Sequence, residues 1–310
     1  MTSNRFNQSL FAVVLSLAVA TQTEAQSSLG VRANGMGGAF VGVADDASAV
    51  YWNPAGLATG ALASVNLELG GLKPGGVLDG DELRHALVGI ALPPLGLAYY
   101  RQGVFGESAA GTAETVAQDR EEVRSSVHAF STSTVAVSLL QSLGEYVVVS
   151  ATPKLVWGGD SFSPDVDASA MMAVTKFRLG LVGRNLASPS FALDDTGGEE
   201  VEVASQVRLG GGWGSGWPGH SRVVVAVDGD LATRVTPTGD RRDVAAGVET
   251  WWLARRLGLR GGVRSSTEGN ARPVVSAGAS ALLVGLYLEG YFSGGEAGER
   301  SWALGLRYSF

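Results

Sequence analysis

The sequence contains no cysteine and only three histidines. Without cysteine the chain forms no disulfide and offers no thiolate ligand to a metal. The histidines (His85, His128 and His220) are scattered, with no acidic or histidine neighbour at the spacing of a metal site. The serines form no GxSxG motif, and no glycine run opens a helix as a phosphate-binding loop does. We therefore expect no enzyme, no metal ion and no cofactor.

Charge is also scarce: 17% of the residues are charged, and the formal net charge is −7. Nucleic-acid binding needs a concentrated basic face, so we expect no nucleic-acid partner. No segment approaches the roughly 20 continuous apolar residues of a membrane-spanning helix. Yet 45% of the residues are hydrophobic, and 44 of 310 are glycine. A chain with one face toward lipid and one toward a lumen has this composition, because it needs charge only inside and in loops.

Residues 1–25 are typical of an export signal. Arg5 supplies a positive start, Leu10 to Ala20 form a short apolar stretch, and Thr23 to Ala25 fit a small-residue cleavage site. The apolar stretch is too short to span a bilayer as a helix. We predict a signal peptide at residues 1–25 and a mature chain beginning near Gln26. The alternative interpretation is a buried N-terminal helix.

Residues 61–310 form a succession of about fourteen strand-like segments, one of which covers residues 201–212. In the final segment one face carries Trp302, Leu304, Leu306, Tyr308 and Phe310, and the other carries Ala303, Gly305, Arg307 and Ser309. The connections alternate between long and short, as at the two ends of an outer-membrane barrel. The sequence therefore predicts an all-β fold: a transmembrane antiparallel β-barrel of about 14 strands. We expect the start of the mature chain and Phe310 at the short-turn end.

Charged residues fall on one side of these strands, the side that would face the lumen. The inner set includes Arg178, Arg208, Glu249, Arg260, Glu289 and Arg307. Because both signs are present, we expect structural ion pairs within this set or with an N-terminal segment. A constriction of one sign would instead favour ion selectivity.

The stretch from Arg32 to Leu57 holds the most unusual residue choices. Its glycines permit tight turns and close packing. Asp45 or Asp46 can cap a short helix over residues 47–51, and Pro54 predicts that this helix ends at Asn53. We predict a compact plug over residues 26–60, held by ion pairs between these two aspartates and luminal arginines.

The sequence GMGGAFVGVADDASAVYWNPAGLA, at residues 35–58, resembles the N-terminal signature of the FadL-type outer-membrane transporters and of the related PorV-like barrel proteins. The most specific part is the Asn-Pro-Ala triplet with two aspartates upstream. This resemblance implies a small hatch inside a barrel of fourteen strands. The hatch and substrate site would consist of Asp45, Asp46, Asn53, Pro54, Ala55 and Gly56.

The ending LGLRYSF, residues 304–310, resembles the closing strand of bacterial outer-membrane barrels. That resemblance implies recognition by the barrel-assembly machinery, outer-membrane lipid around the chain, and a location in the outer membrane of a Gram-negative type of cell.

The resemblance leaves more than one function open. A FadL-like protein admits small hydrophobic molecules, fatty acids or other apolar solutes, through a plugged lumen. A PorV-like protein is a non-enzymatic barrel that binds exported proteins or a secretion or assembly partner. A third interpretation is a structural barrel with a sealed lumen. The short loops, which carry few large apolar side chains, favour the partner-binding interpretation, whereas the hatch signature fits both of the first two.

Overall fold

The computed structural model describes residues 25–26, 28–75, 82–107, 127–192, 200–216, 222–234, 240–269, 273–295 and 298–310. The predicted signal peptide up to residue 24 lies outside the described residues. No helix in the described part of the chain is long and apolar enough to cross a membrane.

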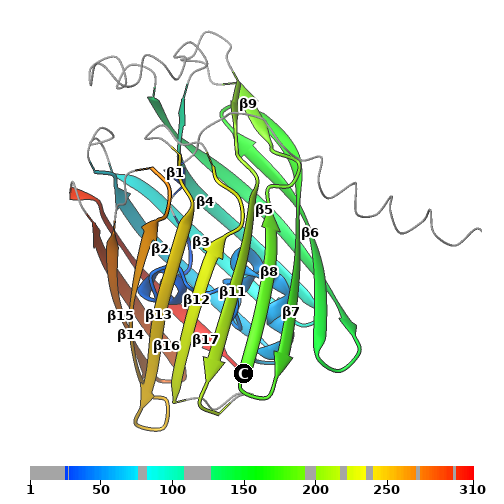
Figure 1. The fold of residues 1–310 in the computed structure, drawn as a ribbon, viewed down its shortest axis with the longest axis vertical. Coiled ribbons are helices and arrows are strands. Elements are labelled where there is room, and N and C mark those ends of the chain that lie inside the picture. Colours follow the sequence, from blue (N-terminus) through cyan, green and yellow to red (C-terminus); the bar gives the residue numbers. More distant parts are fainter. Residues whose placement is uncertain are drawn as a thin grey trace, which may run out of the picture.

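Fourteen antiparallel strands form a closed barrel (Figure 1). Each strand pairs with its neighbours in chain order, β17 pairs with β2, and β4 pairs with both β3 and β5, which closes the ring. The barrel strands are β2 (Ser64–Lys73), β3 (Leu83–Leu92), β4 (Leu95–Glu107), β5 (Val127–Leu143), β6 (Val147–Gly158), β7 (Ser161–Val174), β8 (Phe177–Arg184), β11 (Gln206–Gly214), β12 (Val223–Asp230), β13 (Asp243–Trp252), β14 (Leu257–Ser266), β15 (Val274–Leu283), β16 (Leu286–Gly295) and β17 (Arg300–Ser309). The predicted fold class is confirmed.

The predicted bounds of one strand were wrong. The segment expected over residues 201–212 divides into β10 (Glu200–Glu202) and β11, with Val203 between them. Strand β10 pairs with β9 (Ser190–Ala192) in a separate hairpin, and Val203 is buried against Val156 and Phe191. Burial of Val203 among these side chains turns the chain away from the barrel wall, a tertiary effect that strand periodicity does not encode.

The two faces of the strands differ as the alternation predicts. In β17 the odd-numbered residues Ser301, Ala303 and Arg307 are buried, while Trp302, Leu304, Leu306 and Tyr308 are exposed on the outside. Exposed aromatic side chains occur near both ends of the wall, among them Trp302 and Phe292 at one end and Tyr308 and Phe177 at the other. An apolar belt with aromatic margins is the outer surface of a barrel that faces lipid.

The short turns and the C-terminus lie at the same end of the barrel (Figure 1). The first described residues do not. Strand β1 (Ala25–Gln26) pairs with Val104 and Phe105 of β4, at the long-loop end. The expectation that both chain ends share the short-turn end was therefore wrong. The pairing of β3 with β4 ends at Ala86 with Arg101, and β1 pairs with β4 beyond that point.

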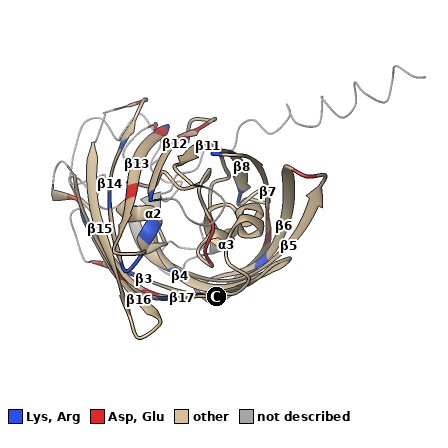
Figure 2. Cartoon of the chain, turned by 90° about the horizontal axis from the view of Figure 1, so that it is seen from below, with Lys and Arg blue, Asp and Glu red and all other residues tan. Residues whose placement is uncertain are grey.

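Residues 28–60, here called the inner segment, lie within the ring of strands (Figure 2). The segment contains α2 (Val31–Gly35), α3 (Ala49–Trp52) and the 3-10 helix η1 (Pro54–Thr59). Helix α2 lies against β14 to β17, α3 against β4 and β5, and η1 against β5, β6 and β7. The three helices of the inner segment therefore contact strands from both halves of the barrel.

Glycines let the inner segment touch the wall directly. Gly37 has a φ of +71°, and a Cβ there would lie 2.6 Å from the backbone nitrogen of Val263. A Cβ on Gly42 would lie 2.8 Å from the carbonyl carbon of Gly211. Backbone-to-backbone packing at these points needs residues without side chains.

Candidate functional site

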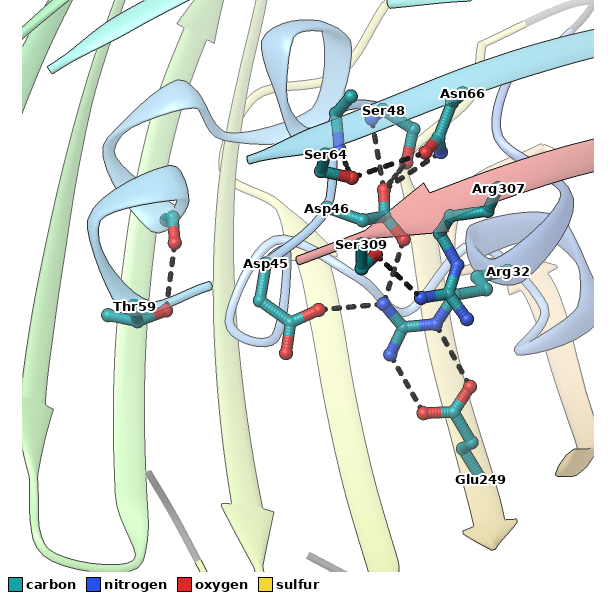
Figure 3. Close-up of polar contacts among 12 residues, drawn as sticks. Arg32, Asp45, Asp46, Ser48, Thr59, Ser64, Asn66, Glu249, Arg307 and Ser309 are labelled. Atoms are coloured by element: carbon teal, nitrogen blue, oxygen red, sulfur yellow. Dashed lines mark hydrogen bonds and ion pairs between the residues drawn. The ribbon is translucent and has the colours of Figure 1, made fainter. Parts of the chain in front are cut away.

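Arg32 of α2 joins three carboxylates inside the barrel (Figure 3). Its Nη1 lies 2.6 Å from Asp45 Oδ1 and 2.8 Å from Asp46 Oδ2. On the wall, Glu249 of β13 accepts from Nε at 3.0 Å and from Nη2 at 2.8 Å, a two-pronged contact. The side chain of Arg32 is 7% exposed, so these bonds are largely shielded from water.

The charges continue along the inner wall from β13 to β17. Arg260 lies 3.5 Å from Glu249 Oε1 and 3.6 Å from Glu289 Oε1, and Arg307 Nη2 lies 2.9 Å from the same Glu289 oxygen. Ser280 also donates to Glu289 at 2.7 Å. We call Arg32, Asp45, Asp46, Glu249, Arg260, Glu289 and Arg307 the luminal charge cluster. Alternating signs compensate charges that burial would otherwise make costly.

The electrostatics hold Arg32 and Asp46 ionised. Burial lowers the pKa of Arg32, but the carboxylates of Glu249, Asp45 and Asp46 more than offset that effect and raise it above its ordinary value. Burial raises the pKa of Asp46, but the charges of Arg32 and Arg307 and a hydrogen bond from Ser48 lower it below its ordinary value.

Two more wall carboxylates bind the backbone of the inner segment. Glu68 of β2 accepts from the N–H groups of Gly30 and Val31, at 3.1 and 2.8 Å, at the start of α2. Asp228 of β12 accepts from the N–H groups of Phe40 and Val41, at 2.7 and 2.8 Å. These carboxylates accept hydrogen bonds from backbone N–H groups that have no acceptor in a regular helix or sheet.

The signature residues at 53–56 contact β7 and the rest of the inner segment. Asn53 Nδ2 donates to the carbonyl oxygens of Val41 at 2.9 Å and Ala170 at 3.3 Å. Ala55 N donates to Ser169 Oγ at 3.0 Å. Pro54 begins η1, and a Cβ on Gly56 would collide with the carbonyl of Ala44. The triplet therefore fixes η1 against the wall.

The predicted helix cap was wrong in detail. Helix α3 begins at Ala49 with Ser48 in the capping position, and Asp46 does not cap it. Asp46 instead accepts from the N–H of Ser48 at 2.9 Å and from Asn66 Nδ2 at 3.2 Å, because Arg32 holds it at the charge cluster. The helix ends at Trp52 before Asn53, as Pro54 predicts.

The structure thus brings together only some of the predicted luminal residues. Glu249, Arg260, Glu289 and Arg307 meet in the cluster. Arg178 lies 3.8 Å from Asp45 at its edge. Arg208 lies apart, 3.1 Å from Asp230 and 3.7 Å from Asp228. Sequence reasoning missed the role of Arg32, although it is the single basic residue between positions 26 and 60.

A second polar and aromatic region lies toward the long-loop end. Tyr51 packs edge-on against Tyr100, with ring centres 5.6 Å apart. The guanidinium of Arg184 on β8 lies 4.6 Å from the Tyr51 ring centre and 5.3 Å from that of Trp52. Tyr51, Tyr100 and Arg184 line a cavity of about 10 Å³, which we call the aromatic pocket; its wall also includes Thr134, Lys154, Asp167, Pro189 and Val203. That volume holds about one water molecule.

Comparison with known proteins identifies the fold. Residues 159–230, under a quarter of the chain, match a family described as "F plasmid transfer operon, TraF, protein". No curated protein sequence matches the chain.

Solved structures match over most of the chain. The toluene transporter TbuX of Ralstonia pickettii has a TM-score of 0.61 at 11% identity, covering 91% of this chain and 98% of its own. The toluene transporter TodX of Pseudomonas putida has a TM-score of 0.58 at 11% identity, covering 93% and 98%. A TodX variant described as a monoaromatic hydrocarbon channel has a TM-score of 0.55 at 12% identity, covering 90% and 97%. The chain therefore has the fourteen-strand barrel fold of FadL-type transporters.

Proposed function

We propose that this protein is a non-enzymatic channel of the outer membrane that admits small hydrophobic molecules, with the inner segment as its hatch. The outer surface supports a place in lipid, since its exposed side chains form an apolar belt with aromatic margins. The solved structures of the same fold include proteins named as toluene transporters. Fatty acids or other apolar solutes are the substrates that the sequence resemblance implies.

One observation supports an apolar solute. Part of the inner wall that faces the inner segment is apolar, whereas the lumen of a water-filled porin is polar. The buried side chains of this wall are Leu87, Ala91, Ala98, Ala136, Val182, Val224, Ala226 and Ala245. If the inner segment shifts, these residues line an apolar path past it.

The contacts of the inner segment support a movable hatch. It is held to the wall by separate hydrogen bonds and ion pairs, such as those of Arg32 with Glu249 and of Ala55 with Ser169. Such contacts can be exchanged for bonds with water or a neighbouring group, whereas a strand of the barrel cannot leave without opening the ring.

A reversible lock tests this function directly. Because the natural chain has no cysteine, the pair Ala55→Cys and Ser169→Cys introduces one disulfide between hatch and wall. We expect uptake of radiolabelled toluene, by cells lacking another hydrocarbon channel, to stop when the pair is oxidised and to return on reduction. Each single-cysteine variant is the matched control. Equal uptake by the oxidised and reduced forms would disprove the movable hatch.

The tight packing of the lumen favours a second candidate. Two cavities that described residues form beside the inner segment measure about 10 and 20 Å³. A barrel that stays closed in this way would instead bind exported proteins or secretion partners at its rim, as the PorV-like resemblance implies. Native mass spectrometry separates the candidates: a bound apolar molecule supports the channel, and a stoichiometric protein partner with an empty lumen supports the docking role.

A further inference from the structure

Arg184 differs from the other buried cations of the lumen. Arg32, Lys154, Arg208, Arg260 and Arg307 each lie within ion-pair distance of at least one carboxylate. Among the described residues no carboxylate lies that close to Arg184, although this residue is only 7% exposed. A buried charge without a counter-charge is costly, so its presence needs a compensating interaction.

The contacts that Arg184 does make leave one donor unused. Its Nη2 donates to Gln206 Oε1, and its planar face lies over the rings of Tyr51 and Trp52. Its Nε has no hydrogen-bond partner in the described part of the chain. The guanidinium is therefore held in place by neutral groups, while its Nε–H and its charge have no partner among the described residues.

One side of the pocket suits an aromatic ring, whereas Lys154 and Asp167, which form an ion pair of 2.7 Å, belong to its polar side. Tyr51 and Tyr100 meet at an interplanar angle of 81°, an edge-to-face arrangement that a third ring can extend. Val156 and Val203 add apolar surface on the side of the long loops. A plain hydrocarbon would fill this space and still leave the Arg184 charge and its Nε–H unpaired.

We propose that the aromatic pocket binds a small aromatic carboxylate, with the carboxylate against Arg184 and the ring against Tyr51 and Tyr100. The inference rests on the proposed function, since it names the class of solute that reaches the hatch. The ring would contact Tyr51, which belongs to α3, so the bound solute would contact the inner segment directly.

Part of the pocket wall comes from residues between β8 and β11. Val203 donates its N–H to the carbonyl of Pro189 at 2.8 Å, and both residues line the pocket. Phe191 of β9 packs on Val156 and Val203. Since the closed cavity holds about one water, a ring can bind only if lining residues such as Pro189 and Val203 move apart from the others.

Calorimetric titration of the purified barrel with benzoate and benzamide tests the proposal, because the two probes share a shape and differ in charge. We expect benzoate to bind at least about tenfold more tightly than benzamide, the worth of one charge-assisted hydrogen bond. Arg184→Gln should remove that preference. The matched control is Arg241→Gln, which removes a guanidinium of the rim that pairs with Asp243 and should change neither affinity.

Two results would overturn the proposal: equal affinities of the natural chain for both probes, or undiminished benzoate binding by Arg184→Gln. If Arg184→Gln does not fold, Tyr100→Leu gives the answer, since loss of one ring wall should weaken benzoate binding severalfold and unchanged binding would contradict the site. Uptake is measured separately. If benzoate binds but does not enter cells, the channel function is refuted and the binding site is retained. If toluene enters cells but benzoate does not bind, the binding site is refuted and the channel function is retained.

Discussion

Arg32 and Glu249 are 217 positions apart in the chain, yet they form two hydrogen bonds of 3.0 and 2.8 Å inside the barrel. One residue belongs to the inner segment and the other to β13, so the pair connects the inner segment to the wall. Glu249 is fully buried, and Arg260 on the next strand lies 3.5 Å away. Changes at this pair therefore test how firmly the inner segment is held.

Removing one partner of this pair should strongly destabilise the protein. Glu249→Gln leaves Arg32 and Arg260 short of a buried counter-charge, and we expect a loss of about 3–5 kcal/mol in the free energy of unfolding. Urea unfolding in lipid vesicles measures it. Arg241→Gln, in a partly exposed rim pair, is the control and should cost about 1 kcal/mol or less. The double variant Arg32→Met, Glu249→Leu should lose less than the sum of its single changes; strict additivity would contradict direct coupling.

The signature residues should affect passage more than folding. Asn53→Ala removes two hydrogen bonds that position η1, and Pro54→Ala removes its rigid first residue. We expect toluene uptake to be lower in both variants. The barrel should still fold, which its heat-dependent shift on electrophoresis measures. Thr59→Ala is the control, because Thr59 bonds only to Gly56 within the same helix. Normal uptake by both variants would remove the proposed role of residues 53–56.

Two glycines in direct contact should respond differently to the same substitution. Gly42→Ala places a Cβ 2.8 Å from Gly211 and should cost about 1–3 kcal/mol, because backbone lies on both sides of the contact. Gly211→Ala meets nothing within 4 Å and should change stability by about 0.5 kcal/mol or less. Thermal unfolding of both variants checks this pair. Similar losses at the two positions would show that the inner segment does not pack on β11 as described.

The pKa of Asp46 gives a pH dependence with a defined sign. A carboxyl whose pKa falls on folding stabilises the protein above its unfolded pKa, here near 3.8, and loses that contribution as pH falls through the folded value. We therefore expect the natural chain and Asp46→Asn to differ in their free energy of unfolding by the same amount at about pH 7 and at about pH 5. That difference should shrink only below about pH 3.8. Urea midpoints at each pH measure it. A difference that shrinks between about pH 7 and pH 5 would mean that Asp46 is not ion-paired in the folded state.

Some of the structure is encoded locally and could be predicted. The direction of each side chain depends on a period of two, which is why the face expected for Trp302, Leu304 and Leu306 is the outer face of β17. The same period places Glu249, Glu289 and Arg307 inside before any partner is known. The end of α3 at Trp52 follows from Pro54, because proline disfavours helical geometry in the residue before it.

Which buried groups meet was decided only by closure of the barrel. Closure brings β13 beside Arg32, joins Asp228 to the backbone at Phe40 and Val41, and leaves Arg184 facing two aromatic rings instead of a carboxylate. The inward course of Val203 also depends on Val156 and Phe191, which belong to other elements. Periodicity fixes the face on which a residue lies, whereas its partner depends on strand register and on the path of the inner segment, and these are set by packing between residues far apart in the chain.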